Sequence, residues 1–328
     1  MEPISLRVGA VQIDCQAGQV QENLRHATDL VEAAVRQKAQ LVLLPELMPS
    51  GYLLTEEIWD CAEPWNGPTC SWLSSLSKRL GIYLGTSFLE AEGEDFYNTF
   101  ALATPAGEMA GKVRKSPPAS LEAYFYRAGS TPHVIETEIG RIGVGICYEN
   151  LLYERLNHLL QSSVDLVLQP TAAGRPLPMR PGDIELFDRM VERIAPRFAK
   201  VLGVPVVLAN RTGHIQTPMP AGLGIFDSNF SGLSRIVDAD ATVKARMGTE
   251  EGVIVAEIHL GPTGKGIPRP RCYGKMWALP VPWYAPMWPQ TQKDGELAYA
   301  DNDLRKQRAL EIHAKKESPE AMFAGKTK

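Results

Sequence analysis

The chain has 328 residues, of which 44% are hydrophobic and 22% charged, a composition typical of a globular protein. Its formal net charge of −4 and its pI of about 5.9 exclude a chain that is basic along its whole length, so we expect no nucleic-acid partner. No apolar run approaches the roughly 18 residues that a membrane-spanning helix needs, so we expect no membrane partner either.

The first residues and the cysteines point to a cytoplasmic protein. Met1–Gly9 contains no basic region followed by an apolar one, as a secretion signal would. The five cysteines include no CxxC pair, which argues against a disulfide scaffold. The six histidines form no cluster at metal-ligand spacing, so we expect no metal.

The first half of the chain alternates between segments typical of strands and of helices. Apolar residues at helical spacing predict helices over Asn23–Gln37 and Cys70–Leu80. Short apolar runs predict buried strands, and a Pro-Ala-Gly turn after residue 104 predicts a hairpin. The predicted strands are Leu6–Ile13, Leu41–Leu44, Ile82–Leu89, Tyr97–Thr104 and a further strand up to Arg114.

The second half repeats this alternation. Helices are predicted over Tyr153–Gln161 and Ile184–Leu202, and Pro196 inside the latter predicts a kink or two shorter helices. Because hairpins are mixed with alternating strands and helices, the pattern predicts an α/β fold in which helices cover mixed sheets. The predicted strands are His133–Glu138, Arg141–Cys147, Val164–Gln169, Val204–Ala209, Ser231–Val237 and Val253–Ile258.

The composition changes at Gly261, which predicts a main domain over 1–260 and a carboxyl-terminal tail over 261–328. The tail holds three of the six tryptophans and is rich in proline, so we expect an extended segment followed by a charged helix near Asp301–Lys316. It could pack on its own domain or clasp a neighbouring subunit, since tryptophan is enriched at interfaces. These two interpretations have equal weight.

Three polar residues follow predicted buried strands, where a rigid frame can hold reactive groups. They are Glu46, Lys115 and Cys147. A thiol between a strand and a helix gains from the helix dipole and from free backbone N–H groups, and a buried carboxylate is a candidate base for it. A cysteine at a strand end is more often a small buried hydrophobe, so these residues alone predict an α/β enzyme with a candidate cysteine nucleophile.

Five motifs, in this order, resemble those of the carbon–nitrogen hydrolase (nitrilase) superfamily, in its amidase-like branch. They extend over about residues 6–260, most of the chain. The motifs are Ala10-Val-Gln12, Leu43-Leu-Pro-Glu46-Leu-Met-Pro-Ser-Gly51-Tyr52, Gly111-Lys-Val-Arg-Lys115, Gly143-Val-Gly-Ile-Cys147-Tyr-Glu149 and Asn210-Arg-Thr-Gly213.

The resemblance implies a four-layer αββα sandwich that often pairs again across a dimer, so we expect a homodimer or a higher homo-oligomer. It also implies that Cys147 is the nucleophile, Glu46 the general base and Lys115 the third catalytic residue. Glu122 matches a second glutamate beside the lysine. The amide nitrogen of Tyr148 would then help Lys115 to stabilise the oxyanion.

The resemblance implies hydrolysis of a small linear amide or N-carbamoyl compound through a thioester, without a cofactor. Alternatives are a nitrilase, an acyltransferase and a catalytically silent binding protein. The motif around Cys147 combines features of two branches, because Tyr148 is typical of amidases whereas Glu149 is typical of nitrilases. We expect Tyr52, Tyr148, Glu149 and Thr171 to contact the substrate.

Two neighbouring features concern the substrate pocket. The segment Pro170–Gly174 lacks an aromatic residue that the family often has there, so the pocket wall is either open or filled from elsewhere. Arg175 and Arg180 could pair with an anionic substrate. The favoured interpretation is that they are solvated loop residues without a specific role.

Overall fold

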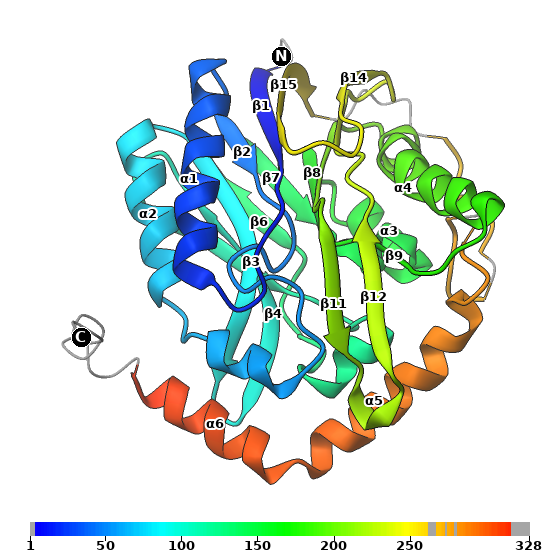
Figure 1. Cartoon of the computed structure of the whole chain (residues 1–328). Helices are drawn as coiled ribbons and strands as arrows, with labels where there is room; N and C mark the ends of the chain where they lie inside the picture. The colour runs from blue at the N-terminus through cyan, green and yellow to red at the C-terminus, as the bar shows by residue number, and fades with distance from the viewer. Residues whose placement is uncertain (1–3, 262–266, 273, 279–280, 316–328) are drawn as a thin grey trace.

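Two mixed sheets pack face to face in the computed structural model, which describes residues 4–261, 267–272, 274–278 and 281–315 (Figure 1). The first sheet has six strands. In order across the sheet they are β15 (Gly252–Leu260), β1 (Ile4–Gln12), β2 (Leu41–Leu43), β3 (Tyr83–Glu92), β4 (Asp95–Ala103) and β5 (Met109–Arg114).

The second sheet also has six strands. They are β14 (Val243–Arg246), β13 (Arg235–Val237), β10 (Val206–Asn210), β8 (Leu166–Thr171), β7 (Gly140–Val144) and β6 (Val134–Thr137). The core between the sheets is built by alternate residues of each strand, such as Val8 and Ala10 of β1 facing Leu168 of β8.

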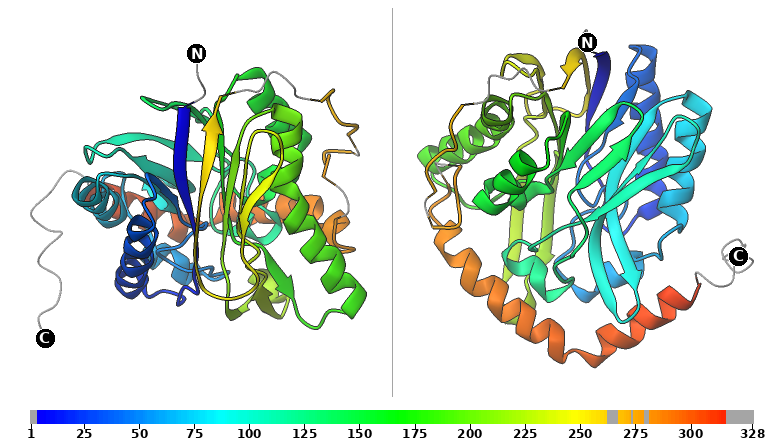
Figure 2. Two further views of the ribbon diagram at one scale, coloured as in Figure 1. Left: turned by 90° about the horizontal axis from the view of Figure 1, so that it is seen from above. Right: turned by 180° about the vertical axis from the view of Figure 1, so that it is seen from behind.

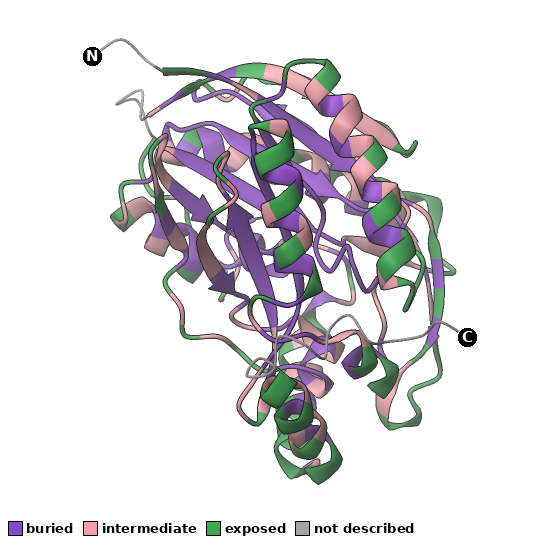
Figure 3. Ribbon diagram, turned by 90° about the vertical axis from the view of Figure 1, so that its left-hand side faces the viewer, coloured by how far each residue is buried: buried purple, intermediate pink, exposed green. Residues whose placement is uncertain are grey.

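Helices cover the outer face of each sheet. The first sheet carries α1 (Val20–Arg36) and α2 (Pro68–Leu80), and the second carries α3 (Tyr153–Gln161) and α4 (Pro181–Leu202). Figure 2 shows these layers from above, and Figure 3 shows buried strands between helices whose outward residues are exposed. The predicted four-layer αββα sandwich is confirmed. No helix among the described residues is both long and apolar enough to cross a bilayer.

The prediction of two shorter helices around Pro196 is wrong, because α4 is continuous through it. Proline has no N–H to donate to the carbonyl of Glu192, one turn earlier. The guanidinium of Arg235 replaces that donor, with its Nη1 at 2.6 Å from the Glu192 carbonyl oxygen. A hydrogen bond from a neighbouring strand therefore satisfies the acceptor that proline leaves free.

The tail is less extended than predicted, since two helices form after residue 287. They are α5 (Trp288–Asp301) and α6 (Asp303–Ala314), and Lys316 of the predicted helix lies outside the described residues. Gly295 lets α5 approach a short 3₁₀ helix, η2 (Ser120–Tyr124), because a Cβ there would lie 2.9 Å from the Ala123 carbonyl carbon. On α6, buried Arg305 pairs with Asp95 at 2.7 Å. The two helices run along one edge of the sandwich (Figure 2).

A small third sheet, which the sequence did not predict, stands beside the sandwich. Its strands are β11 (His214–Pro218), β12 (Ile225–Phe230) and β9 (Gly174–Pro176). In both large sheets the central strands are parallel, since β1, β2 and β3 run one way and β7, β8 and β10 run together. Polar residues that follow these strands therefore gather at one edge of each sheet.

Candidate active site

Four predicted residues meet where these strand ends converge. Glu46 follows β2, Lys115 follows β5, Glu122 lies in η2, and Cys147 begins the 3₁₀ helix η3 (Cys147–Leu151). The Lys115 Nζ lies 2.6 Å from Glu46 Oε1 and 2.7 Å from Glu122 Oε2. The ammonium group is therefore held between two carboxylates in the interior of the protein.

The two carboxylate oxygens of Glu46 differ in their hydrogen bonding. Its Oε1 also accepts a hydrogen bond from Asn98 Nδ2 at 2.8 Å, whereas Oε2 is buried and has no hydrogen-bond partner among the described residues. Burial raises the pKa of Glu46, and the opposing effects of Lys115 and the neighbouring Cys147 thiol only partly offset this. The carboxylate thus has a raised proton affinity and one oxygen available for a proton.

At neutral pH the side chain of Lys115 is charged, whereas that of Cys147 is neutral. Burial disfavours the ammonium of Lys115, but the carboxylates of Glu122 and Glu46 outweigh this and raise its pKa. Burial also raises the pKa of the Cys147 thiol well above its usual value, and Glu46 adds to the effect. The lysine is therefore charged and the cysteine is a neutral thiol, which needs a base before it can act as a nucleophile.

The turn that carries Cys147 has a strained backbone. Cys147 has φ of 50°, in the left-handed region that residues other than glycine rarely adopt. Leu47, next to Glu46, and Ser120, near Glu122, have φ of 47° and 49°. Backbone strain of this kind persists where surrounding contacts enforce it and is concentrated at functional sites.

Asn150 holds this turn, although the sequence did not single it out. Its Nδ2 donates to the carbonyl oxygens of Gly145 at 2.7 Å and Cys147 at 3.1 Å, and its Oδ1 accepts from Gln169 at 3.0 Å. A Cβ at Gly145 would lie 2.1 Å from Asn150 Oδ1, so only glycine fits there. The only sequence signal was a polar residue directly after the Cys-Tyr-Glu motif.

Glu149 corrects one expectation, because it is completely buried and does not line the substrate cavity. Its Oε1 lies 2.7 Å from His133 Nε2, 3.0 Å from Arg155 Nη2 and 2.8 Å from the backbone nitrogen of Ser116. Its Oε2 accepts from the Ile146 nitrogen at 2.7 Å. Glu149 therefore connects the segment after Lys115 to the turn before Cys147, with no oxygen left for a substrate.

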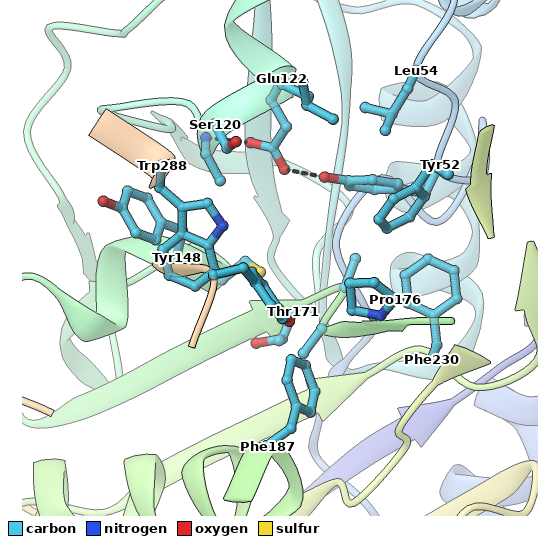
Figure 4. A pocket seen from close by; sticks show the side chains of 18 of the residues that line it. Tyr52, Leu54, Ser120, Glu122, Tyr148, Thr171, Pro176, Phe187, Phe230 and Trp288 are labelled. Atoms are coloured by element: carbon cyan, nitrogen blue, oxygen red, sulfur yellow. Dashed lines mark hydrogen bonds between the residues drawn. The ribbon is translucent and has the colours of Figure 1, made fainter. Parts of the chain in front are cut away.

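A cavity of about 620 Å³ opens beside Cys147 and Glu122. Tyr52, Tyr148 and Thr171, which we expect to contact the substrate, lie on its wall. The Tyr52 hydroxyl donates to Glu122 Oε1 at 2.8 Å, which leaves its ring facing the cavity (Figure 4). In the same view Tyr148 lies on the opposite side from Tyr52.

The tail fills the wall that the segment Pro170–Gly174 leaves without an aromatic residue. Trp283, Tyr284 and Trp288 line the cavity. The ring of Trp288 packs edge-on against that of Tyr148, with centroids 5.2 Å apart at 84° (Figure 4). The sequence showed an aromatic-rich tail but not where it lies, because this contact joins segments that are 140 residues apart in the sequence.

The loop arginines do not belong to the cavity wall. Arg175 pairs with Asp188 at 3.1 Å, and neither Arg175 nor Arg180 lines the cavity. Within the described part of the chain, no three His, Cys, Asp or Glu side chains are grouped to hold a metal ion. The reactive groups that the site offers are a thiol, a carboxylate with a raised pKa and an ammonium ion.

Known proteins resemble this chain in sequence and in fold. The family model for carbon–nitrogen hydrolases matches residues 7–265. An N-carbamoylputrescine amidase from Solanum lycopersicum is 31% identical over 77% of this chain and 86% of its own. A nitrilase from Pyrococcus abyssi is 30% identical over 78% of this chain and 90% of its own. The crystal structure of a carbon–nitrogen hydrolase from Helicobacter pylori has the same fold, with a TM-score of 0.72 and 22% identity over 78% of this chain and 89% of its own.

Proposed function

Since the chain belongs to the carbon–nitrogen hydrolase family and hydrolyses carbon–nitrogen bonds other than peptide bonds, we propose that it cleaves a small amide or N-carbamoyl compound through a thioester on Cys147. The observation that carries this proposal is the buried Lys115 ammonium between Glu46 and Glu122, beside a protonated thiol. A neutral thiol next to a carboxylate of raised pKa suits general-base activation during the attack, rather than a thiolate formed beforehand.

In the first half of the reaction Glu46 accepts the thiol proton while the sulfur attacks the carbonyl carbon. The carbonyl oxygen gains negative charge, which the Lys115 ammonium stabilises. The Tyr148 N–H is a second donor, because the second residue of a short helix such as η3 has no intrahelical partner for its N–H. Protonated Glu46 then gives the proton to the nitrogen, which leaves as ammonia or an amine, and a thioester remains.

In the second half Glu46 removes a proton from water, and the resulting hydroxide equivalent attacks the thioester carbon. The sulfur leaves and recovers the proton from Glu46, and a carboxylic acid is released. Glu122 holds Lys115 in place throughout, and Tyr52 holds Glu122. We place Asn98 and Glu149 behind these groups as positioning residues.

Replacing Cys147 tests this proposal. The Cys147→Ala variant should release no ammonia from any amide, and mass spectrometry of the wild-type protein should detect an acyl group on Cys147 during turnover. Cys272 is exposed and outside the cavity, so Cys272→Ala is the control and should retain activity. Full turnover by Cys147→Ala would refute the proposal. If thiol reagents fail to label Cys147, the alternative of a catalytically silent binding protein is favoured.

The nitrilase relative supports a second candidate, in which the same residues convert a nitrile to an acid through a thioimidate. One acyl group assayed as both nitrile and amide separates the two reactions, because exclusive nitrile turnover would favour the nitrilase. Transfer to added hydroxylamine in excess of hydrolysis would indicate an acyltransferase.

We further propose a cytoplasmic homo-oligomer that acts on a small molecule without nucleic-acid or membrane partners. Family resemblance supports the oligomer, and sizing the protein in solution tests it. A monomer at micromolar concentration would contradict it.

A further inference from the structure

The cavity beside Cys147 is walled mainly by hydrocarbon. Four elements that are far apart in the sequence contribute aromatic rings: Tyr148 from η3, Phe187 from α4, Phe230 from β12 and Trp288 from α5. Figure 4 shows Tyr148 and Trp288 on one side, Phe230 and Tyr52 on the other, and Phe187 at the end away from Glu122. Met190, Val191 and Ile194 of α4 complete the apolar wall.

Charged groups are scarce along this wall. No lysine, arginine or histidine is among the described residues that line the cavity, and its charged members are Glu122 and Asp227. Glu122 is already bound to Lys115 and Tyr52. Asp227 is hydrogen-bonded at 2.8 Å to His214 and at 2.9 Å to Gln216. The wall thus offers no cation to a carboxylate and no unpartnered anion to an amine.

The rim of the cavity is apolar as well. Five lining residues remain between 37% and 66% exposed: Leu177, Leu223, Ile225, Trp283 and Met287. They come from β12, from the segments beside it and from the tail. An acyl group that extends outward from Cys147 would therefore meet mainly hydrocarbon.

We infer that this site selects uncharged amides with a large hydrocarbon acyl group, aromatic or long-chain, and that Trp288 of the tail is a specificity-determining residue. The inference rests on the proposed function, since it concerns the acyl half of the same substrate. A volume of about 620 Å³ is far larger than acetamide requires and lies within the range of about 300–1,000 Å³ typical of sites for larger ligands. A charged acyl end would lose its hydration here without gaining a partner, which is unfavourable.

The test compares primary amides that differ only in the acyl group, scored by kcat/KM for ammonia release. The panel is acetamide, hexanamide, phenylpropionamide and two analogues of hexanamide that carry a terminal amine or carboxylate. We expect hexanamide and phenylpropionamide to exceed acetamide and both charged analogues by about a hundredfold or more, the scale on which apolar pockets discriminate.

The Trp288→Ala variant tests the role of the tail. It should lower kcat/KM for phenylpropionamide at least about tenfold more than for acetamide, because the ring contacts the acyl group rather than the reacting carbon. Leu297→Ala is the matched control, since Leu297 lies on the same helix, is 60% exposed and does not line the cavity. It should leave the preference unchanged.

The outcomes separate this inference from the proposed function. If the charged analogues or acetamide are the best substrates, or if Trp288→Ala lowers all rates equally, the inference is overturned while the amidase stands. If no amide releases ammonia, the proposed function fails, and calorimetry with the Cys147→Ala protein then decides the inference. Tighter binding of hexanamide than of its charged analogues supports it, and equal or weaker binding overturns it.

Discussion

His133 and Glu149 form a buried pair directly beneath the turn that carries Cys147, with His133 Nε2 2.7 Å from Glu149 Oε1. Arg155 binds the same oxygen at 3.0 Å, so removing the carboxylate would leave the guanidinium without its anionic partner and two backbone N–H groups, those of Ser116 and Ile146, without an acceptor. We predict that Glu149→Ala lowers the free energy of unfolding by about 3–5 kcal/mol, the usual effect of breaking a buried ion pair. Chemical denaturation measures this.

The contribution of Glu149 to the free energy of unfolding should depend on pH. Burial raises its pKa, but His133 and Arg155 outweigh this and hold the pKa below the ordinary value of 4.5. The stabilisation is therefore present above pH 4.5 and is lost as the pH falls through the lower, folded-state pKa. Glu136→Ala is the control, because Glu136 pairs with Arg141 at the surface and should change stability little. Equal stability of Glu149→Ala and the wild type at neutral pH would contradict this prediction.

Asn98 should set the acidic limb of the pH–rate profile through Glu46. In Asn98→Leu the carboxylate loses a hydrogen bond that favours its charged form, so the pKa of Glu46 rises further. Because Glu46 must be ionised to accept the thiol proton, we expect the acidic limb of kcat/KM to move to higher pH. A pH profile of ammonia release measures the shift.

Thr86→Val is the matched control for Asn98→Leu. Thr86 is also completely buried, and its hydroxyl donates to the carbonyl of Pro45, next to Glu46, at 2.9 Å. Its loss removes a neutral hydrogen bond from the same segment without touching the carboxylate, so the limb should stay in place. An unmoved limb in Asn98→Leu would show that Glu46 does not control it.

Lys115→Met should remove activity and make stability rise more steeply than in the wild type as the pH falls. Without the ammonium, kcat should fall by about a hundredfold or more. The carboxylates of Glu46 and Glu122 would then lie close together with no cation between them, which raises the pKa of Glu46 further above its ordinary value. The folded state would bind more protons than the unfolded state, so stability should rise as the pH falls from about 8 to about 5.

Unfolding by urea at these two pH values measures the effect in Lys115→Met and in the wild type. Lys293 is an exposed lysine of α5, so Lys293→Met serves as the control and should follow the wild type at both pH values. If the stability of Lys115→Met changes in parallel with that of the wild type on acidification, the two carboxyls are not coupled through Lys115.

The order of the strands and helices was predictable because most strands of this fold are buried on both faces and the main helices have one apolar face. Val206 and Leu208 of β10 face α4 while Val207 and Ala209 face the other sheet, which produces a continuous apolar run. By contrast, α5 has a mostly polar sequence in which apolar residues do not repeat at helical spacing, and β11 alternates exposed polar residues with only two buried side chains, Ile215 and Thr217.

The reactive residues were predictable from motifs, but their surroundings were not. Glu149 lies two residues after Cys147, so we expected it to contact the substrate. Its partners His133 and Arg155 come from other segments and hold it away from the cavity. Trp288 was one of three tail tryptophans that sequence alone could not rank. Which residue faces a cavity depends on contacts between distant segments, and local patterns do not encode these.

Arg235 offers a test of how α4 remains continuous through Pro196. Arg235→Met keeps the aliphatic part of the side chain but leaves the Glu192 carbonyl without its 2.6 Å hydrogen bond. The expected loss in the free energy of unfolding is about 1–3 kcal/mol, the effect of a buried acceptor left unpaired. Introducing Pro196→Ala into this variant restores an N–H four residues after Glu192 and should recover most of the loss. Pro196→Ala in the wild type should gain less, because Arg235 already occupies that oxygen.

The four proteins form a double-mutant cycle, in which a coupling energy beyond about 0.5 kcal/mol shows that the two substitutions act on the same carbonyl. Arg189→Met is the control, since Arg189 lies on α4 but is 51% exposed and pairs with Glu185 on the surface of the same helix. It should show no coupling to Pro196→Ala. Additive effects of Arg235→Met and Pro196→Ala would mean that the helix continues through the proline for another reason, such as the packing of Phe198 and Ala195 against the second sheet.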